Sequence, residues 1–70
     1  MYSFAKSLRK ADHTRHYSIR AANSGWEVRE EQDSQVVRQK QYYDWHRVER
    51  ARRMFAIKLD LLREQGWQDV

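Results

Sequence analysis

The clearest hydrophobic pattern of the chain lies in its last third, where apolar side chains recur every three or four residues. Plotted at about 100° per residue, the main apolar positions of residues 45–65 fall within a sector of about 120°. Those positions are Trp45, Val48, Ala51, Phe55, Leu59 and Leu62. Asp44 is a favourable N-cap ahead of the run, and Gly66 suits the left-handed residue that ends many helices. We therefore predict one amphipathic helix over residues 45–65.

Ahead of this helix the pattern changes to an alternation of apolar and polar residues, which is typical of half-buried strands. Tyr17 and Ile19 alternate with polar neighbours in a first run, and Trp26 and Val28 do so in a second. Clusters of turn-forming residues, Asn-Ser-Gly and Gln-Asp-Ser, follow the two runs. Short turns favour antiparallel neighbours. The fold class predicted is α+β, a three-stranded antiparallel meander packed by one C-terminal helix.

The pattern of apolar residues in the third strand, residues 36–43, does not show which face of the strand points toward the core. Val36 and Tyr42 share one parity, and Val37 and Tyr43 share the other. We expect its basic residues to join Arg20, Arg29, Glu27 and Glu31 on the outer face of the sheet, where alternating signs favour cross-strand pairing. The basic residues concerned are Arg38 and Lys40.

Residues 1–14 are polar with scattered apolar positions and show no sustained period. Phe4 and Leu8 are four residues apart, so that one helical turn presents both on one face. We expect a flexible or weakly helical basic segment at residues 1–14, followed by a single small α+β domain at residues 15–70.

Composition adds a charge bias to this picture. The 70 residues carry 14 Lys and Arg against 10 Asp and Glu, a formal net charge of +4, and no Cys or Pro. The absence of Cys excludes a disulfide-stapled scaffold and a Cys-based zinc site. No apolar run of about 20 residues is present, and basic residues interrupt the N-terminal stretch, so we expect a cytoplasmic protein without a membrane partner. Residues 1–22 carry five basic side chains against one acidic, which places the excess there.

A second apolar strip on the predicted helix suggests an interaction surface. Met54, Ile57 and Leu61 lie away from the main stripe, and one helix on one sheet cannot bury both. Either the N-terminal segment covers this strip or a second molecule does, and three exposed apolar side chains are also common on protein surfaces. We favour a small non-enzymatic module for binding a protein partner or for self-association.

The alternative is nucleic-acid binding through basic side chains, which neutralise phosphates and release counterions. Its candidate residues come from the N-terminal segment and the start of the helix: Lys6, Arg9, Lys10, Arg15, Arg47, Arg50 and Arg53. Glu49 precedes Arg53 by four residues, a spacing that favours an ordinary helix ion pair. Because the excess positive charge lies in the terminal segment and not in the predicted domain, we rank nucleic-acid binding second to protein interaction.

The sequence offers no catalytic set and no metal site. His13 and His16 stand near Asp12, but two histidines without cysteine in a terminal segment are usually unliganded. His46 has no serine, cysteine or paired carboxylate beside it in sequence with which to perform acid–base or nucleophilic chemistry. We therefore expect neither an enzyme nor a bound cofactor.

Three short runs of the sequence resemble a group of short uncharacterised bacterial proteins. The runs are Gly25-Trp26-Glu27-Val28-Arg29, Asp44-Trp45-His46-Arg47-Val48-Glu49-Arg50 and Gly66-Trp67. No activity is established for that group, so the resemblance implies no function and no site. In architecture alone, three strands and a helix are similar to plant AP2-type and phage-integrase amino-terminal DNA-binding domains, whose sequence motifs are not visible here.

Overall fold

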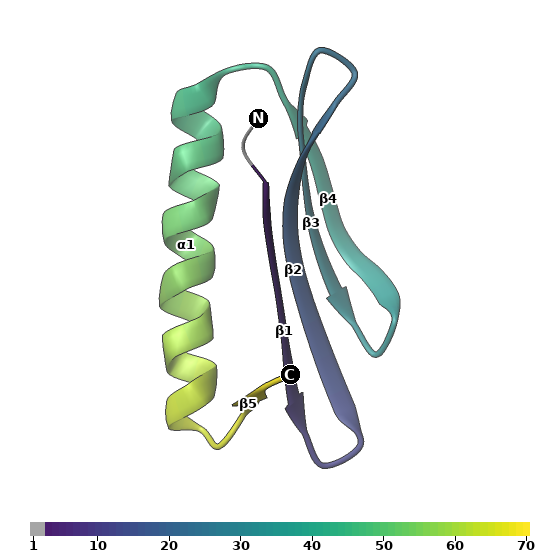
Figure 1. The fold of residues 1–70 in the computed structure, drawn as a ribbon, viewed down its shortest axis with the longest axis vertical. Helices are drawn as coiled ribbons and strands as arrows, with labels where there is room; N and C mark the ends of the chain where they lie inside the picture. The colour runs from purple at the N-terminus through teal and green to yellow at the C-terminus, as the bar shows by residue number, and fades with distance from the viewer. Residues whose placement is uncertain (1–2) are drawn as a thin grey trace.

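The computed structural model describes residues 3–70, which form one antiparallel sheet with a single long helix across one face (Figure 1). The elements follow in the order β1 (Phe4–Lys10), β2 (His13–Ala22), β3 (Gly25–Gln32), β4 (Gln35–Tyr42), α1 (Trp45–Glu64) and β5 (Gln68–Asp69). Each of β1 to β4 pairs antiparallel with the next, and β5 adds to the far side of β1. The sheet order is therefore β4-β3-β2-β1-β5.

Two-residue turns impose this meander. Asn23 and Ser24, between β2 and β3, have φ values of 51° and 66°, and Asp33 and Ser34, between β3 and β4, have values of 52° and 68°. Two successive positive φ angles make a type I′ turn, whose twist matches that of a hairpin. Gly25 follows the first turn because a Cβ there would collide with the backbone carbonyl oxygen of Tyr42.

The prediction of three strands is wrong, because the sheet has a four-stranded meander and a short fifth strand. Residues 4–10, expected within a flexible or weakly helical segment, are strand β1. Phe4 and Leu8 fit a strand as well as a helical turn, and pairing with β2 buries Leu8 completely. Lys6 stands between them on the same face and hides the alternation. The likeness to three-stranded DNA-binding domains therefore loses its basis.

The helix prediction is confirmed, and its ends match the expected signals. The Asp44 carboxylate accepts a hydrogen bond from the backbone N–H of His46, and Gly66 ends the helix with a φ of 99°. The backbone N–H of Trp67 donates to the carbonyl oxygen of Leu62, as in a Schellman stop. The core lies between α1 and β1–β3 and consists of Leu8, Tyr17, Ile19, Val28, Val48, Phe55, Leu59 and Leu62.

A β-bulge decides which way β4 faces. Glu30 pairs with Arg38, whereas the next residue, Glu31, pairs with Val36, so that Val37 is the extra residue. Beyond the bulge, the face that carries Arg38 and Tyr42 is the face that α1 covers, since Tyr42 packs against the core. The expectation that Arg38 and Lys40 lie on the outer face is therefore wrong.

Candidate interaction groove

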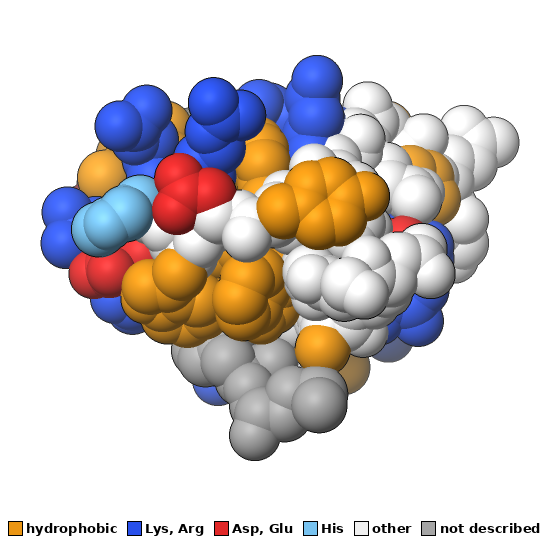
Figure 2. Space-filling view, turned by 90° about the horizontal axis from the view of Figure 1, so that it is seen from above, with side chains coloured by type: hydrophobic (Ala, Val, Ile, Leu, Met, Phe, Trp, Pro, Cys, Tyr) orange, Lys and Arg blue, Asp and Glu red, His pale blue; other side chains and the backbone are white. Residues whose placement is uncertain are grey.

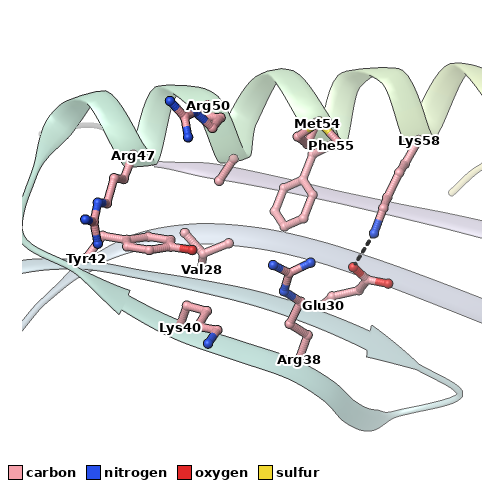
Figure 3. Close-up of a pocket in the computed structure, with 11 residues that line it drawn as sticks. Val28, Glu30, Arg38, Lys40, Tyr42, Arg47, Arg50, Met54, Phe55 and Lys58 are labelled. Atoms are coloured by element: carbon pink, nitrogen blue, oxygen red, sulfur yellow. Dashed lines mark hydrogen bonds and ion pairs between the residues drawn. The ribbon is translucent and has the colours of Figure 1, made fainter.

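A groove of about 400 Å³ runs between α1 and the strands β3 and β4 (Figure 3). Its floor is apolar, because Val28, Ala51 and Phe55 lie at its base with the ring of Tyr42. Its cations come from β4 on one side and from α1 on the other, and its one acidic residue, Glu30, comes from β3. The full lining is Val28, Glu30, Arg38, Lys40, Tyr42, Arg47, Arg50, Ala51, Met54, Phe55 and Lys58.

Simple periodicities place these side chains together. In β4, Arg38, Lys40 and Tyr42 are two residues apart, so they point to the same face of the sheet. In α1, the residues of the groove recur at steps of three and four, so they form one flank of the helix. That helical set is Arg47, Arg50, Ala51, Met54, Phe55 and Lys58.

The groove holds an uncompensated positive charge. Five of its lining residues are cationic and one, Glu30, is acidic. Glu30 is only 7% exposed, and the Lys58 ammonium lies 3.0 Å from one of its carboxylate oxygens. Among residues 3–70, the other four cations of the groove have no carboxylate within ion-pair distance: Arg38, Lys40, Arg47 and Arg50.

The groove accounts for the whole net charge of the chain. Outside it remain nine basic and nine acidic side chains, because the chain carries 14 and 10 in total. Residues 1–22 also net +4, but their cations are spread over both faces of the sheet instead of lining one groove, and two of them contact groups near the C-terminal end of α1. Lys10 donates to the carbonyl oxygen of Gln65 at 2.6 Å, and the Arg15 guanidinium lies 5.1 Å from the centre of the Trp67 ring.

Of the residues considered for nucleic-acid binding, only Arg47 and Arg50 line the groove. Arg53 pairs instead with Glu49 at 2.9 Å, as its spacing indicated. The remaining four lie on β1 and β2, outside the groove: Lys6, Arg9, Lys10 and Arg15. Figure 2 shows the end of the molecule at which α1 begins, where Lys and Arg side chains gather along one edge and outnumber the acidic ones.

The apolar strip of the helix adjoins the groove. Met54, Ile57 and Leu61 are 50%, 54% and 51% exposed, and Met54 is itself part of the groove wall. At about 100° per residue, Ile57 and Leu61 fall on the Met54 side of the helix rather than on the flank toward β1. The strip and the groove therefore form one continuous surface, half apolar and half basic.

Sequence reasoning missed the contribution of β4 to this surface. The sequence pattern predicts Arg38 and Lys40 on the outer face and does not decide the face of Tyr42, because nothing in the pattern indicates the bulge at Val37. The signal that was present is the two-residue spacing of Arg38, Lys40 and Tyr42, which places them together whichever way the strand faces.

The outer face of the sheet pairs its charges internally. One carboxylate oxygen of Glu27 lies 3.0 Å from Arg20 and 3.0 Å from Arg29, and the Gln39 amide donates to the other at 2.9 Å. The Ser7 hydroxyl and the His16 Nδ1 are hydrogen-bonded at 2.6 Å. This face therefore shows the cross-strand pairing that alternating signs indicated.

The resolved pKa shifts lie away from the groove. A hydrogen bond from Arg63 holds the pKa of Asp69 below its usual value, and hydrogen bonds from the Thr14 N–H and from His13 lower the pKa of Asp33.

Within residues 3–70, no three His, Asp or Glu side chains gather in a way that would hold a metal ion. In the same part of the chain, no helix has the length and apolarity needed to cross a bilayer.

Comparison with known proteins adds no family to this geometry. A scan against protein-family models finds no match, and searches among curated proteins and solved structures find none either. The functional argument therefore rests on the groove.

Proposed function

We propose that the protein is a small non-enzymatic interaction module that binds an acidic segment of another protein in the groove between α1 and β4. The observation that carries the proposal is the charge distribution. The lining of one groove nets +4, and four of its cations lack a carboxylate partner among residues 3–70. Like charges held close together without partners disfavour the free protein, so an anionic partner is the natural source of compensation.

The apolar half of the surface favours a protein over a purely ionic ligand. Met54, Ile57 and Leu61 expose about half of their surface beside the basic wall. Protein interfaces commonly combine an apolar centre with a polar, charged rim, and arginine and methionine are enriched in them. A partner segment with both carboxylates and apolar side chains would cover the two halves together.

A second copy of the chain suits this surface poorly. In a two-fold dimer the same patch lies on both sides of the interface, so the basic half of one copy would meet the basic or the apolar half of the other and would find no acidic surface there. Like-charge juxtaposition of that kind costs several kcal/mol. We therefore place a different, acidic chain on the strip rather than a homodimer.

Nucleic acid would also satisfy the cations, but it accounts for less of the surface. Proteins that bind single strands combine a basic groove with aromatic rings on which successive bases stack. Here the lining has two aromatic residues, and one of them, Phe55, is buried in the core. Tyr42 alone remains as a stacking platform, and the apolar strip has no role in such a complex.

Fluorescence anisotropy with labelled probes of equal charge tests the proposal. The probes are a peptide in which glutamate and valine are mixed, an oligoglutamate and an oligothymidylate. The full chain is expected to bind the mixed peptide most tightly. Replacing Arg47 and Arg50 together by Glu should weaken this binding by about 100-fold, since each lost or reversed ionic contact costs on the order of 1–2 kcal/mol.

The matched control reverses two cations on the outer face of the sheet, Arg9→Glu with Arg20→Glu, which changes the net charge by the same amount. This control is expected to retain binding within about threefold at physiological salt, because screening confines the effect to nearby charges. Equal losses in the two double variants would show attraction by overall charge alone and would overturn the groove. Tighter binding of oligothymidylate, lost with Arg47 and Arg50, would establish nucleic acid as the ligand instead, and no binding of any probe would refute both.

A further inference from the structure

The strand that forms one wall of the groove is also an open edge of the sheet. β4 stands first in the sheet order, so its second side pairs with no strand among residues 3–70. The opposite edge is partly covered, because β5 pairs with β1 at Leu8 and Arg9. An edge strand presents unpaired N–H and C=O groups to which another chain can add. This edge therefore differs from an ordinary sheet edge in that it borders a basic groove.

The hydrogen-bond alternation identifies which backbone groups point outward. The two-residue turn at Asn23 and Ser24 makes Ala22 and Gly25 a hydrogen-bonded pair, and such pairs alternate along antiparallel strands. Counting across β3 in this way, the residues of β4 that bond to β3 are those paired with Trp26, Val28 and Glu30. The backbone groups of the residues between them, Gln39 and Gln41, therefore point toward the open edge.

The side chains of these two glutamines leave the edge accessible. The Gln41 side-chain amide donates to the Ala22 carbonyl oxygen at 2.6 Å, and that of Gln39 donates to the Glu27 carboxylate at 2.9 Å. Both side chains are thus held on the outer face of the sheet. The bulge at Val37 limits the regular part of the edge to residues 38–42.

The same edge is built against pairing with a copy of itself. If two β4 strands paired antiparallel about Gln39, Arg38 of each would face Lys40 of the other. Like charges directly opposite one another on neighbouring strands are destabilising. A partner strand with carboxylates opposite Arg38 and Lys40 would be attracted instead of repelled. Within the described residues, these two cations have no other carboxylate partner.

We propose that the acidic partner binds as an added β-strand along residues 38–42 of β4, with acidic side chains at alternate positions directed into the groove. This inference rests on the proposed function and specifies its ligand. Backbone hydrogen bonds to Gln39 and Gln41 hold the strand, and the carboxylates meet Arg38 and Lys40 from β4 and Arg47 and Arg50 from α1. Side chains at the intervening positions point to the outer face, beside Gln39 and Gln41. The recognised pattern is therefore acidic–any–acidic in an extended chain.

Two peptides of identical composition test the pattern on the full-length protein. In one, glutamate alternates with valine, and in the other the glutamates precede the valines in a block. The alternating peptide should bind at least about tenfold more tightly, because only there do all carboxylates share one face. Hydrogen exchange supplies a second readout, in which the Gln39 and Gln41 amides should exchange more slowly in the complex.

Methylation of the peptide backbone separates strand addition from simple charge attraction. N-methyl groups on the peptide residues whose N–H groups face β4 should weaken binding by about tenfold or more. The same number of N-methyl groups on the intervening residues, whose N–H groups face solvent, should not weaken it. If the alternating and block peptides bind equally, both methylated sets are tolerated and Gln39 and Gln41 stay unprotected, strand addition is wrong while the acidic-partner function stands. If neither peptide binds at all, the proposed function fails with it.

Discussion

The cations on the two sides of helix α1 differ in their partners. Near β1 and the C-terminal end of the helix, three cations contact groups within the molecule. Lys10 binds the carbonyl oxygen of Gln65, Arg15 lies over Trp67, and Arg63 donates to Asp69 through two nitrogens, each 2.8 Å from a carboxylate oxygen. On the side toward β4, Lys58 pairs with Glu30, and within residues 3–70 the other four cations of the groove have no carboxylate partner.

This difference separates charge that supports the fold from charge available for recognition. Basic groups at a helix C-terminus interact favourably with its carbonyl groups, and a guanidinium over an aromatic ring stabilises both. Clustered cations without partners gain nothing of this kind and repel one another. Stability alone therefore explains the first flank and does not explain the second.

The largest effect on stability that distinguishes the flanks is expected at Trp67. Its side chain packs against the core, and Arg15 lies over its ring. Trp67→Ala should lower the free energy of unfolding by about 3 kcal/mol, measured by urea denaturation. Met54→Ala, on the half-exposed groove flank, is the matched truncation and should cost less than about 1 kcal/mol. Equal losses at the two sites would contradict the division of the helix into a structural and a recognition flank.

The sequence anticipates the structural flank better than the recognition flank, for physical reasons. The helix follows from a strong period, an Asp cap and a Gly stop, each of which acts locally. Strand β1 is not predicted from the sequence because Lys6 interrupts the apolar residues of its inner face. Its existence depends on pairing with β2, which no local pattern reveals.

The residues that α1 contributes to the groove can be predicted from the sequence, whereas the facing of those from β4 cannot. Arg47, Arg50 and Met54 were all singled out from the helix, where the spacing of residues fixes their common flank. Arg38 and Lys40 were placed on the wrong face, because one extra residue at Val37 reverses the facing of everything after it. The bulge depends on the register between β3 and β4, which no local pattern in the sequence specifies. Because the bulge turns Arg38 and Lys40 toward the groove, the net charge of the groove could not be predicted either.

A finer test replaces one arginine on each flank. Arg15→Gln should reduce the free energy of unfolding by about 0.5–1 kcal/mol, since it removes the contact with the Trp67 ring. Arg50→Gln should leave the free energy unchanged or raise it by about 0.2–0.5 kcal/mol, because it relieves repulsion from Arg47 three residues away. The two variants lose the same charge, so their difference reports the local environment. A loss at Arg50 as large as that at Arg15 would indicate a structural role for the groove cations.

The smallest effect concerns acid, and it arises on the structural flank. Arg63 lowers the pKa of Asp69 below the value of 3.8 that an unperturbed aspartate has. The unfolded chain therefore binds more protons than the folded chain in the window just below pH 3.8, and stability falls as the pH falls through that window. Asp69→Asn should lose stability at neutral pH and show a shallower decline in melting temperature on acidification.

Arg63→Gln supplies the control for this pH dependence. Without the guanidinium, the main cause of the lowered pKa of Asp69 is gone, so the decline in melting temperature should flatten as it does in Asp69→Asn. Combining the two substitutions should add little to the flattening, because both remove the same interaction. The measurement is the thermal unfolding midpoint as a function of pH for the parent and the three variants. A profile for Asp69→Asn that runs parallel to that of the parent would show that this pair does not couple protonation to folding, and the β3–β4 turn, where Asp33 has the other lowered pKa, would be the next site to test.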